Sequence, residues 1–161
     1  MLLPVALSLV MLSSAPSLAG PCDLLDRAAA GTLAGAPVSP GISQPPEPDD
    51  ETNGILSYCM YRAPKGAVIV SLVAFANAGD AKKATTKELV AGRLEGDQKE
   101  LKEETGLGDK AFWAYTEEGA QYVVLKGANV VAVSIGGGLP KPPASYHDAL
   151  RTAAASASGK L

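Results

Sequence analysis

The sequence has 161 residues, of which 47% are hydrophobic and 5% aromatic, and its 14 basic and 17 acidic side chains give a net charge of −3. A chain this close to neutrality has no basic stripe for nucleic acid or for an anionic membrane, and its few aromatic residues argue against a base-stacking surface. We therefore exclude nucleic-acid binding, and the length predicts one domain with its own core.

An apolar segment, LLPVALSLVML, occupies residues 2–12. Ser17 and Ala19 place small residues at positions −3 and −1 of a cleavage site, which predicts a signal peptide over residues 1–19, although no Lys or Arg precedes the apolar run. A membrane anchor is the alternative, but the run is shorter than the ~20 residues that a bilayer span needs. We expect residues 20–161 to form an exported protein, periplasmic or secreted, with no membrane span after processing.

The two cysteines, Cys22 and Cys59, both lie in the exported part of the chain. An even number of cysteines outside the cytosol predicts a disulfide, with two buried free thiols as the alternative. Lipid attachment at Cys22 is disfavoured because Pro21 separates this cysteine from the small residues that precede a lipoprotein cysteine. Redox catalysis is disfavoured because it commonly uses a close CxxC pair.

The first predicted elements are a helix over residues 22–34 and a proline-rich loop over residues 36–53. Apolar residues from Leu25 to Leu33 recur at i, i+4 spacing, and Gly35 stands where a C-terminal cap is expected. The loop contains five prolines and an acidic trio. This composition favours an extended, mobile segment over a functional one.

Strand-like runs follow at residues 55–62 and 67–76, and we expect them to pair as a hairpin. The second run is apolar on both faces, which predicts a strand covered on both sides. A helix is predicted from Asp80 to about Glu95. The charged stretch at residues 97–105 is predicted to be solvated surface, either helix or loop.

Three further strands are predicted at residues 111–116, 120–126 and 129–135, where short turns make them a meander. Ser145, with Asp148 three residues later, predicts the start of a C-terminal helix. The order α-ββ-α-βββ-α predicts a single α+β domain with about five antiparallel strands, a hairpin plus a meander, and three helices.

The segments PCDLLDRAAAGTLAG and LSYCMYR, followed by an apolar strand, a helix and GLGDKAFW, resemble the LpqN-like family of exported actinobacterial domains. The matching points are Cys22, Cys59 and the turn at residues 106–109, and the resemblance spans most of residues 20–161. It implies a PsbP-like α/β sandwich and a binding or scaffolding role without established catalytic residues. The lipobox of many members is absent from this sequence.

Few residues suggest chemistry. The glycine-rich segments at residues 106–109 and 136–138 lack the third glycine or the directly following helix of a phosphate site, which favours turns. His147 is the single histidine and no GxSxG motif is present, so a surface histidine is favoured over a triad or a zinc site. The acidic residues 49–51 lack the pattern of a calcium loop and are expected to be solvated. We expect no catalytic residues, no metal and no cofactor.

Trp113, Tyr115 and Tyr122 fall on neighbouring predicted strands. Alternation places Trp113 and Tyr115 on one face, and the hairpin register brings Tyr122 opposite or diagonal to them. Exposed, the three rings would form a contact patch of the kind that dominates binding hot spots. Buried, they would belong to the core, which is the favoured alternative.

These observations predict a non-enzymatic exported binding module that recognises a protein or a cell-envelope component. One alternative is a carrier that holds a small apolar ligand in a pocket between the sheet and the helices. A less favoured alternative is a hydrolase that uses carboxylates. A roomy internal cavity would favour the carrier, and acidic side chains converging in a cleft would favour the hydrolase.

Overall fold

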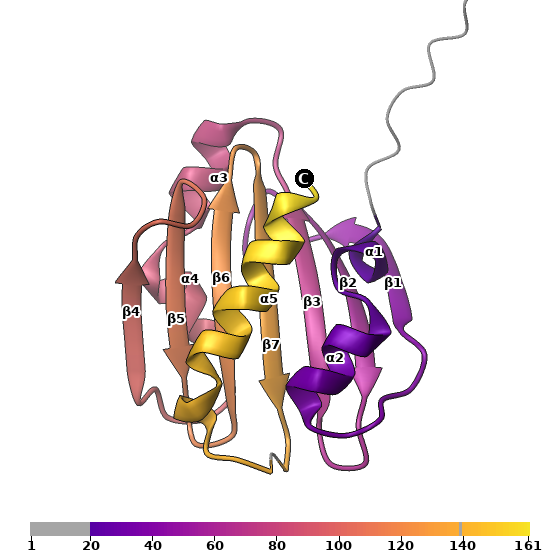
Figure 1. Ribbon diagram of the computed structural model, residues 1–161. Helices are drawn as coiled ribbons and strands as arrows, with labels where there is room; N and C mark the ends of the chain where they lie inside the picture. The colour runs from indigo at the N-terminus through magenta and orange to yellow at the C-terminus, as the bar shows by residue number, and fades with distance from the viewer. Residues whose placement is uncertain (1–19, 139) are drawn as a thin grey trace, which may run out of the picture.

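One antiparallel sheet of seven strands organises the chain, in the order β1-β2-β3-β7-β6-β5-β4 (Figure 1). The computed structural model describes residues 20–138 and 140–161, so the signal peptide expected over residues 1–19 lies outside the described residues. The strands are β1 (Ile42–Pro48), β2 (Ile55–Arg62), β3 (Ala67–Ala74), β4 (Glu100–Glu104), β5 (Lys110–Tyr115), β6 (Gly119–Lys126) and β7 (Asn129–Gly136). The helices are α1 (Pro21–Leu24), α2 (Arg27–Ala34), α3 (Ala78–Ala84), α4 (Lys87–Gly92), the 3₁₀-helix η1 (Pro143–Tyr146) and α5 (His147–Gly159).

The expectation of five strands and three helices is wrong, although the α+β class holds. The hairpin β2–β3 and the meander β5–β6–β7 are present, and β3 pairs with β7 to join them into one sheet. The two additional strands, β1 and β4, form the two edges of the sheet.

Neither edge strand has the alternating apolar sequence that is typical of a strand. β1 lies within the predicted loop and carries three prolines, which an edge strand tolerates because its outer side needs no ladder hydrogen bonds. Its register shifts between Gln44 and Glu47, where two prolines interrupt the pairing with β2. β4 has the sequence ELKEE and lies within the stretch predicted to be solvated. Charged side chains are typical of edge strands, since they hinder pairing with another chain.

Two predicted helices are divided in the structure by new caps. The helix predicted over residues 22–34 breaks where Leu25 is extended, and the carboxylate of Asp26 accepts the Ala29 N–H at 2.8 Å to start α2. The helix predicted from Asp80 breaks before Thr86, whose hydroxyl accepts the Leu89 N–H to start α4. Side-chain oxygens at these positions satisfy free N–H groups, which favours a new helix start over continuation.

The helices divide between the two faces of the sheet. Helices α1, α2 and α5 lie in front of the sheet in Figure 1, on what we call the α5 face, and α3 and α4 lie behind it, on the α3/α4 face. The larger core lies on the α5 face and includes Val70, Tyr122 and Leu150. A smaller core on the α3/α4 face includes Phe112 and Val123. Among the described residues, no helix combines the length and the apolar character needed to cross a membrane.

The α3/α4 face is covered over only part of its width. Helix α3 packs on β6 and β7, and α4 packs on β4 and β5 (Figure 1). The strand predicted over residues 67–76 is buried on the α5 face, where the side chains of Val68 and Val70 are inaccessible to solvent. On the other face Ile69 and Ser71 are only half-buried, so the expected coverage on both sides is incomplete.

Candidate functional site

The uncovered part of the α3/α4 face carries a row of apolar side chains. Ile42 on β1 is paired with Met60 on β2, and Met60 is paired with Ile69 on β3, so the three side chains point to the same side. Tyr58 lies two residues from Met60 on that side. Ile42 is 47% exposed, and the others are half-buried. We call these four residues the open face.

A loop, rather than a helix, packs beside the open face. Residues 49–54 connect β1 to β2, and Gly54 is buried so closely that a Cβ at this position would collide with Val73 and crowd the ring of Phe75. The Gly54 N–H donates to the Thr52 hydroxyl at 3.1 Å, and the Asp49 N–H donates to the Gly54 carbonyl at 3.0 Å. This part of the proline-rich segment is therefore a packed turn.

Arg93, at the C-terminus of α4, holds the same loop by its charge. Its Nη2 lies 2.8 Å from Asp49 Oδ2, and its Nε lies 3.6 Å from Glu51 Oε2. Thr52 donates a further hydrogen bond of 2.6 Å to Asp49. The Asp49 side chain is only 7% exposed, so the expectation that this acidic trio is solvated does not describe Asp49.

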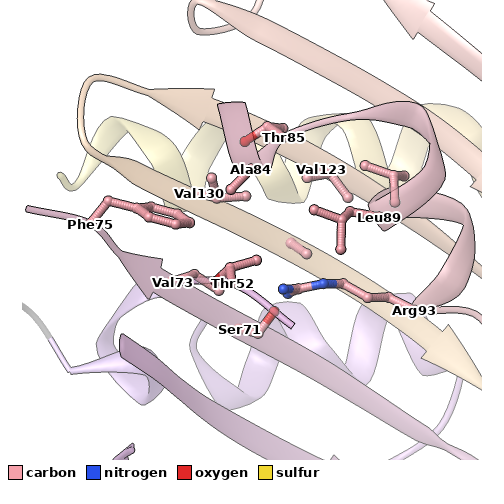
Figure 2. Close-up of a pocket in the computed structure, with 12 residues that line it drawn as sticks. Thr52, Ser71, Val73, Phe75, Ala84, Thr85, Leu89, Arg93, Val123 and Val130 are labelled. Carbon is pink, nitrogen blue, oxygen red and sulfur yellow. The ribbon is translucent and has the colours of Figure 1, made fainter. Parts of the chain in front are cut away.

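A small apolar cavity lies beneath this ion pair, between α3, α4 and the sheet. In Figure 2 the Arg93 side chain extends across the cavity toward Ser71, with Leu89 and Val130 among the lining residues. The cavity measures about 20 Å³, which is room for about one water molecule. This cavity is therefore too small for an apolar ligand.

A larger groove continues from the open face past the end of α4. It measures about 320 Å³, and its floor includes the side chains of Ile69 on β3 and Ser134 on β7. The residues at its sides are Arg93, Leu94, Glu95 and Glu118. We call this hollow the α4 groove. Its volume falls within the roughly 300–1,000 Å³ that small-ligand sites occupy.

A polar cluster lies on the opposite face, where α5 begins over the edge of the sheet. Glu104, the last residue of β4, accepts hydrogen bonds from the Tyr122 hydroxyl and from Arg151 Nη1, both at 2.6 Å. His147 Nε2 lies 2.7 Å from the other Glu104 oxygen, and its Nδ1 lies 2.8 Å from Asp148. We call Glu104, Tyr122, His147 and Arg151 the Glu104 cluster.

The hydrogen bonds of this cluster hold Glu104 ionised. Its side chain is 8% exposed, and burial alone would raise its pKa. The hydrogen bonds from Tyr122, His147 and Arg151 outweigh burial and lower the pKa of Glu104 to about 2. Burial and the neighbouring carboxylate raise the pKa of Tyr122 to about 12. Burial also acts to lower the pKa of His147, but its contacts with Asp148 and Glu104 outweigh it and raise that pKa.

The side chains of the Glu104 cluster are hydrogen-bonded to one another, so few of their polar atoms remain for a substrate. Both carboxylate oxygens of Glu104 already accept hydrogen bonds, and Arg151 also donates to the Tyr122 hydroxyl at 2.8 Å. Such an arrangement joins α5 to β4 and β6. Within residues 20–138 and 140–161, no group of three or more His, Cys, Asp or Glu side chains is arranged to hold a metal ion.

The three aromatic residues singled out in the sequence lie together on the α5 face. Trp113 is paired directly with Tyr122, and the rings of Trp113 and Tyr115 lie 5.8 Å apart. Trp113 is 2% exposed and Tyr122 is fully buried, whereas Tyr115 is half-buried. The rings of Trp113 and His147 meet edge to face at 5.1 Å. Trp113 and Tyr122 are therefore core residues, and little of this trio is free for a partner.

The disulfide between Cys22 and Cys59 is present, with Cα atoms 5.0 Å apart. It joins α1 to the second strand, and Cys59 is fully buried. Gly41 lies against both sulfurs, so closely that a Cβ there would meet Cys59 Sγ at 2.6 Å and Cys22 Sγ at 3.1 Å. The Tyr61 hydroxyl donates to the Cys22 carbonyl at 3.3 Å. The opening of the chain is thus fixed covalently to the α5 face.

Sequence reasoning missed Glu104, Arg151, Arg93 and the open face. Glu104 and Arg93 stand in charged segments that resemble ordinary surface, and their partners lie on distant strands and loops. One signal for the open face was present: residues 67–76 are apolar on both sides, yet three predicted helices are few for covering both faces of a sheet. If the helices are too few to cover both faces, an apolar row of the sheet stays exposed to solvent.

Comparison with known proteins does not assign the site. The sequence matches no protein-family model and no curated protein. The open face, the α4 groove and the Glu104 cluster are therefore the candidate sites of this protein.

Proposed function

We propose that this chain is a non-enzymatic binding module of the cell exterior that recognises another protein through the open face. The observation that carries the proposal is the row Ile42, Met60 and Ile69, which lies on a part of the sheet that α3 and α4 leave uncovered. Contiguous exposed apolar surface on a folded protein commonly marks an interaction site. The disulfide supports a location outside the reducing cytosol.

Two features support binding over catalysis. The buried carboxylate of Glu104 is occupied by three neighbouring side chains, so it is not free to act as a base. The cavity between the sheet and α3/α4 is too small for a ligand, which favours recognition at the surface over carriage in the interior. The resemblance to LpqN-like domains, with its implied binding role, agrees with this proposal.

Site-specific crosslinking tests the proposal. A photoreactive amino acid replaces Met60 on the open face, and a matched variant carries it at Thr152, which is exposed on α5. The two proteins are expressed in their native host and irradiated in intact cells. We expect a covalent adduct with one defined protein from position 60 only, and we expect that Ile69→Glu in the same chain abolishes it. Adducts from position 152 alone, or no adduct from position 60, would contradict the proposal.

A further inference from the structure

The charges around the α4 groove are mainly negative. Arg93 is the one basic side chain that lines the groove, and Asp49 and Glu51 already neutralise it. Glu95 and Glu118 are exposed at the sides of the groove. Among the described residues, neither of these two carboxylates lies within ion-pair distance of a basic side chain.

The floor beneath these carboxylates is apolar and continuous with the open face. Ile69 belongs to both surfaces, and Ala67 and Leu94 extend the apolar lining of the groove. At the end of the groove the lining residues Gly136 and Gly137 carry no side chains. A partner that crosses the open face therefore meets apolar surface first and negative charge at the end of α4.

We propose that the α4 groove binds a protein segment in which an apolar side chain lies next to a lysine or an arginine. This inference rests on the function proposed above and adds the chemistry of the partner. The apolar side chain lies over Ile69, and the long aliphatic stem of the basic residue covers Leu94. Its cationic end then reaches Glu95 and Glu118, since lysine and arginine commonly bury their stems while their charges remain near water.

Charge complementarity favours a basic segment over an acidic one as the occupant. Counting the charged groups of the groove and of the ion pair beside it gives one positive charge, on Arg93, against four carboxylates. Lys141 lines the neighbouring hollow, which shares Glu118, and it is not within ion-pair distance of that residue. Like charges brought together at an interface suppress the wrong partner, whereas opposite charges favour encounter.

Peptide selection tests this inference. The mature protein is used to select binders from a library of short random peptides, and the bound peptides are sequenced. We expect lysine or arginine next to aliphatic residues to be enriched among them. The double variant Glu95→Gln/Glu118→Gln should bind the selected peptides about five- to tenfold more weakly and should lose much of its salt dependence. The matched control Glu88→Gln/Glu103→Gln makes the same change in net charge on α4 and β4, and we expect it to bind as the wild type does.

The outcomes separate this inference from the proposed function. Peptides that bind, lose affinity on Ile69→Glu and show no basic preference would overturn the chemistry assigned to the groove while leaving the open face as a binding site. Equal effects of the two double variants would also overturn it, because the charge would then act at long range. Selection of no peptide, together with no crosslink from position 60, would count against both proposals.

Discussion

The two faces of the sheet differ in how completely the chain covers them. On the α5 face, three helices, a disulfide and the Glu104 cluster bury strands β2, β3, β7, β6 and β5. On the α3/α4 face, two helices of seven and six residues cover one half, and the open face meets solvent. The buried contacts are therefore concentrated on one face, and the other face is the one that we propose for binding. The following experiments test that division, from the largest expected effect to the smallest.

Removal of the disulfide should have the largest effect on stability. The variant Cys22→Ala/Cys59→Ala should lose about 4 kcal/mol in free energy of unfolding, because the bond closes a loop of roughly 38 residues in the denatured chain. Urea denaturation of the oxidised wild type and of this variant measures the difference. The wild type under strong reductant should unfold at the same urea concentration as the variant. A loss below about 1 kcal/mol would show that the α5 face does not depend on this bond.

A cavity in the core of the α5 face should cost more than the same kind of change on the open face. Leu150→Ala on α5 removes a fully buried side chain and should destabilise the protein by about 3 kcal/mol. Ile69→Ala truncates a half-buried side chain and should cost about 1 kcal/mol. Thermal and urea unfolding of both variants give the comparison. Equal costs would mean that the two faces contribute alike to stability.

Substitution of the buried carboxylate should destabilise the contact between α5 and the sheet. Glu104→Gln leaves Arg151 near a neutral amide and should cost about 2 kcal/mol, a charged hydrogen-bond partner being lost from a buried site. Because the folded pKa of Glu104 is lowered to about 2, its contribution is present above the unfolded value of 4.5 and disappears as pH falls toward 2. Acid unfolding should therefore be less steep in the variant. Parallel acid profiles for the two proteins would contradict this assignment.

His147 should add a smaller and opposite pH dependence. Its folded pKa is raised above 6.5, so its stabilising contact with Glu104 is fully present below 6.5 and is lost as pH rises through the folded pKa. The difference in free energy of unfolding between the wild type and His147→Asn should shrink from acidic to alkaline buffer. A difference that stays constant across this range would show that folding does not raise the pKa of His147.

The smallest effect on stability is expected on the open face itself. Met60→Gln replaces a half-buried apolar side chain by a polar one of similar length and should change the free energy of unfolding by less than about 0.5 kcal/mol. The same variant should bind the partner identified by crosslinking more weakly, which the dissociation constant of the two purified proteins measures. Loss of stability without loss of binding would reverse the roles assigned to the two faces.

The elements that the sequence predicts well are those whose side chains repeat with the period of the structure. The strands at 55–62 and 129–135 are rich in β-branched and aromatic residues, and both appear within one residue of the expected bounds. The left-handed cap at Gly35 also follows from local rules, with φ of 65°. Local patterns of this kind are decided within a few residues and need no knowledge of distant partners.

The elements that the sequence fails to predict are stabilised by distant contacts. β4 has no apolar alternation, because only Leu101 of this strand packs against the core of the α3/α4 face. On the other face, Glu104 accepts hydrogen bonds from residues of β6 and α5. β1 is hidden by prolines that its edge position allows. The disulfide could be predicted from the sequence, because an even number of cysteines in an exported chain indicates pairing. The open face and the Glu104 cluster depend on which strands become neighbours.

The edges of the sheet determine how an apolar face can remain uncovered without causing polymerisation. β1 ends in proline-rich sequence with a shifted register, and β4 carries four charged residues in five. A second copy therefore gains little by adding its own strand to either side, and fibre growth through main-chain hydrogen bonds is disfavoured. Association through the open face would therefore place two molecules face to face, not edge to edge.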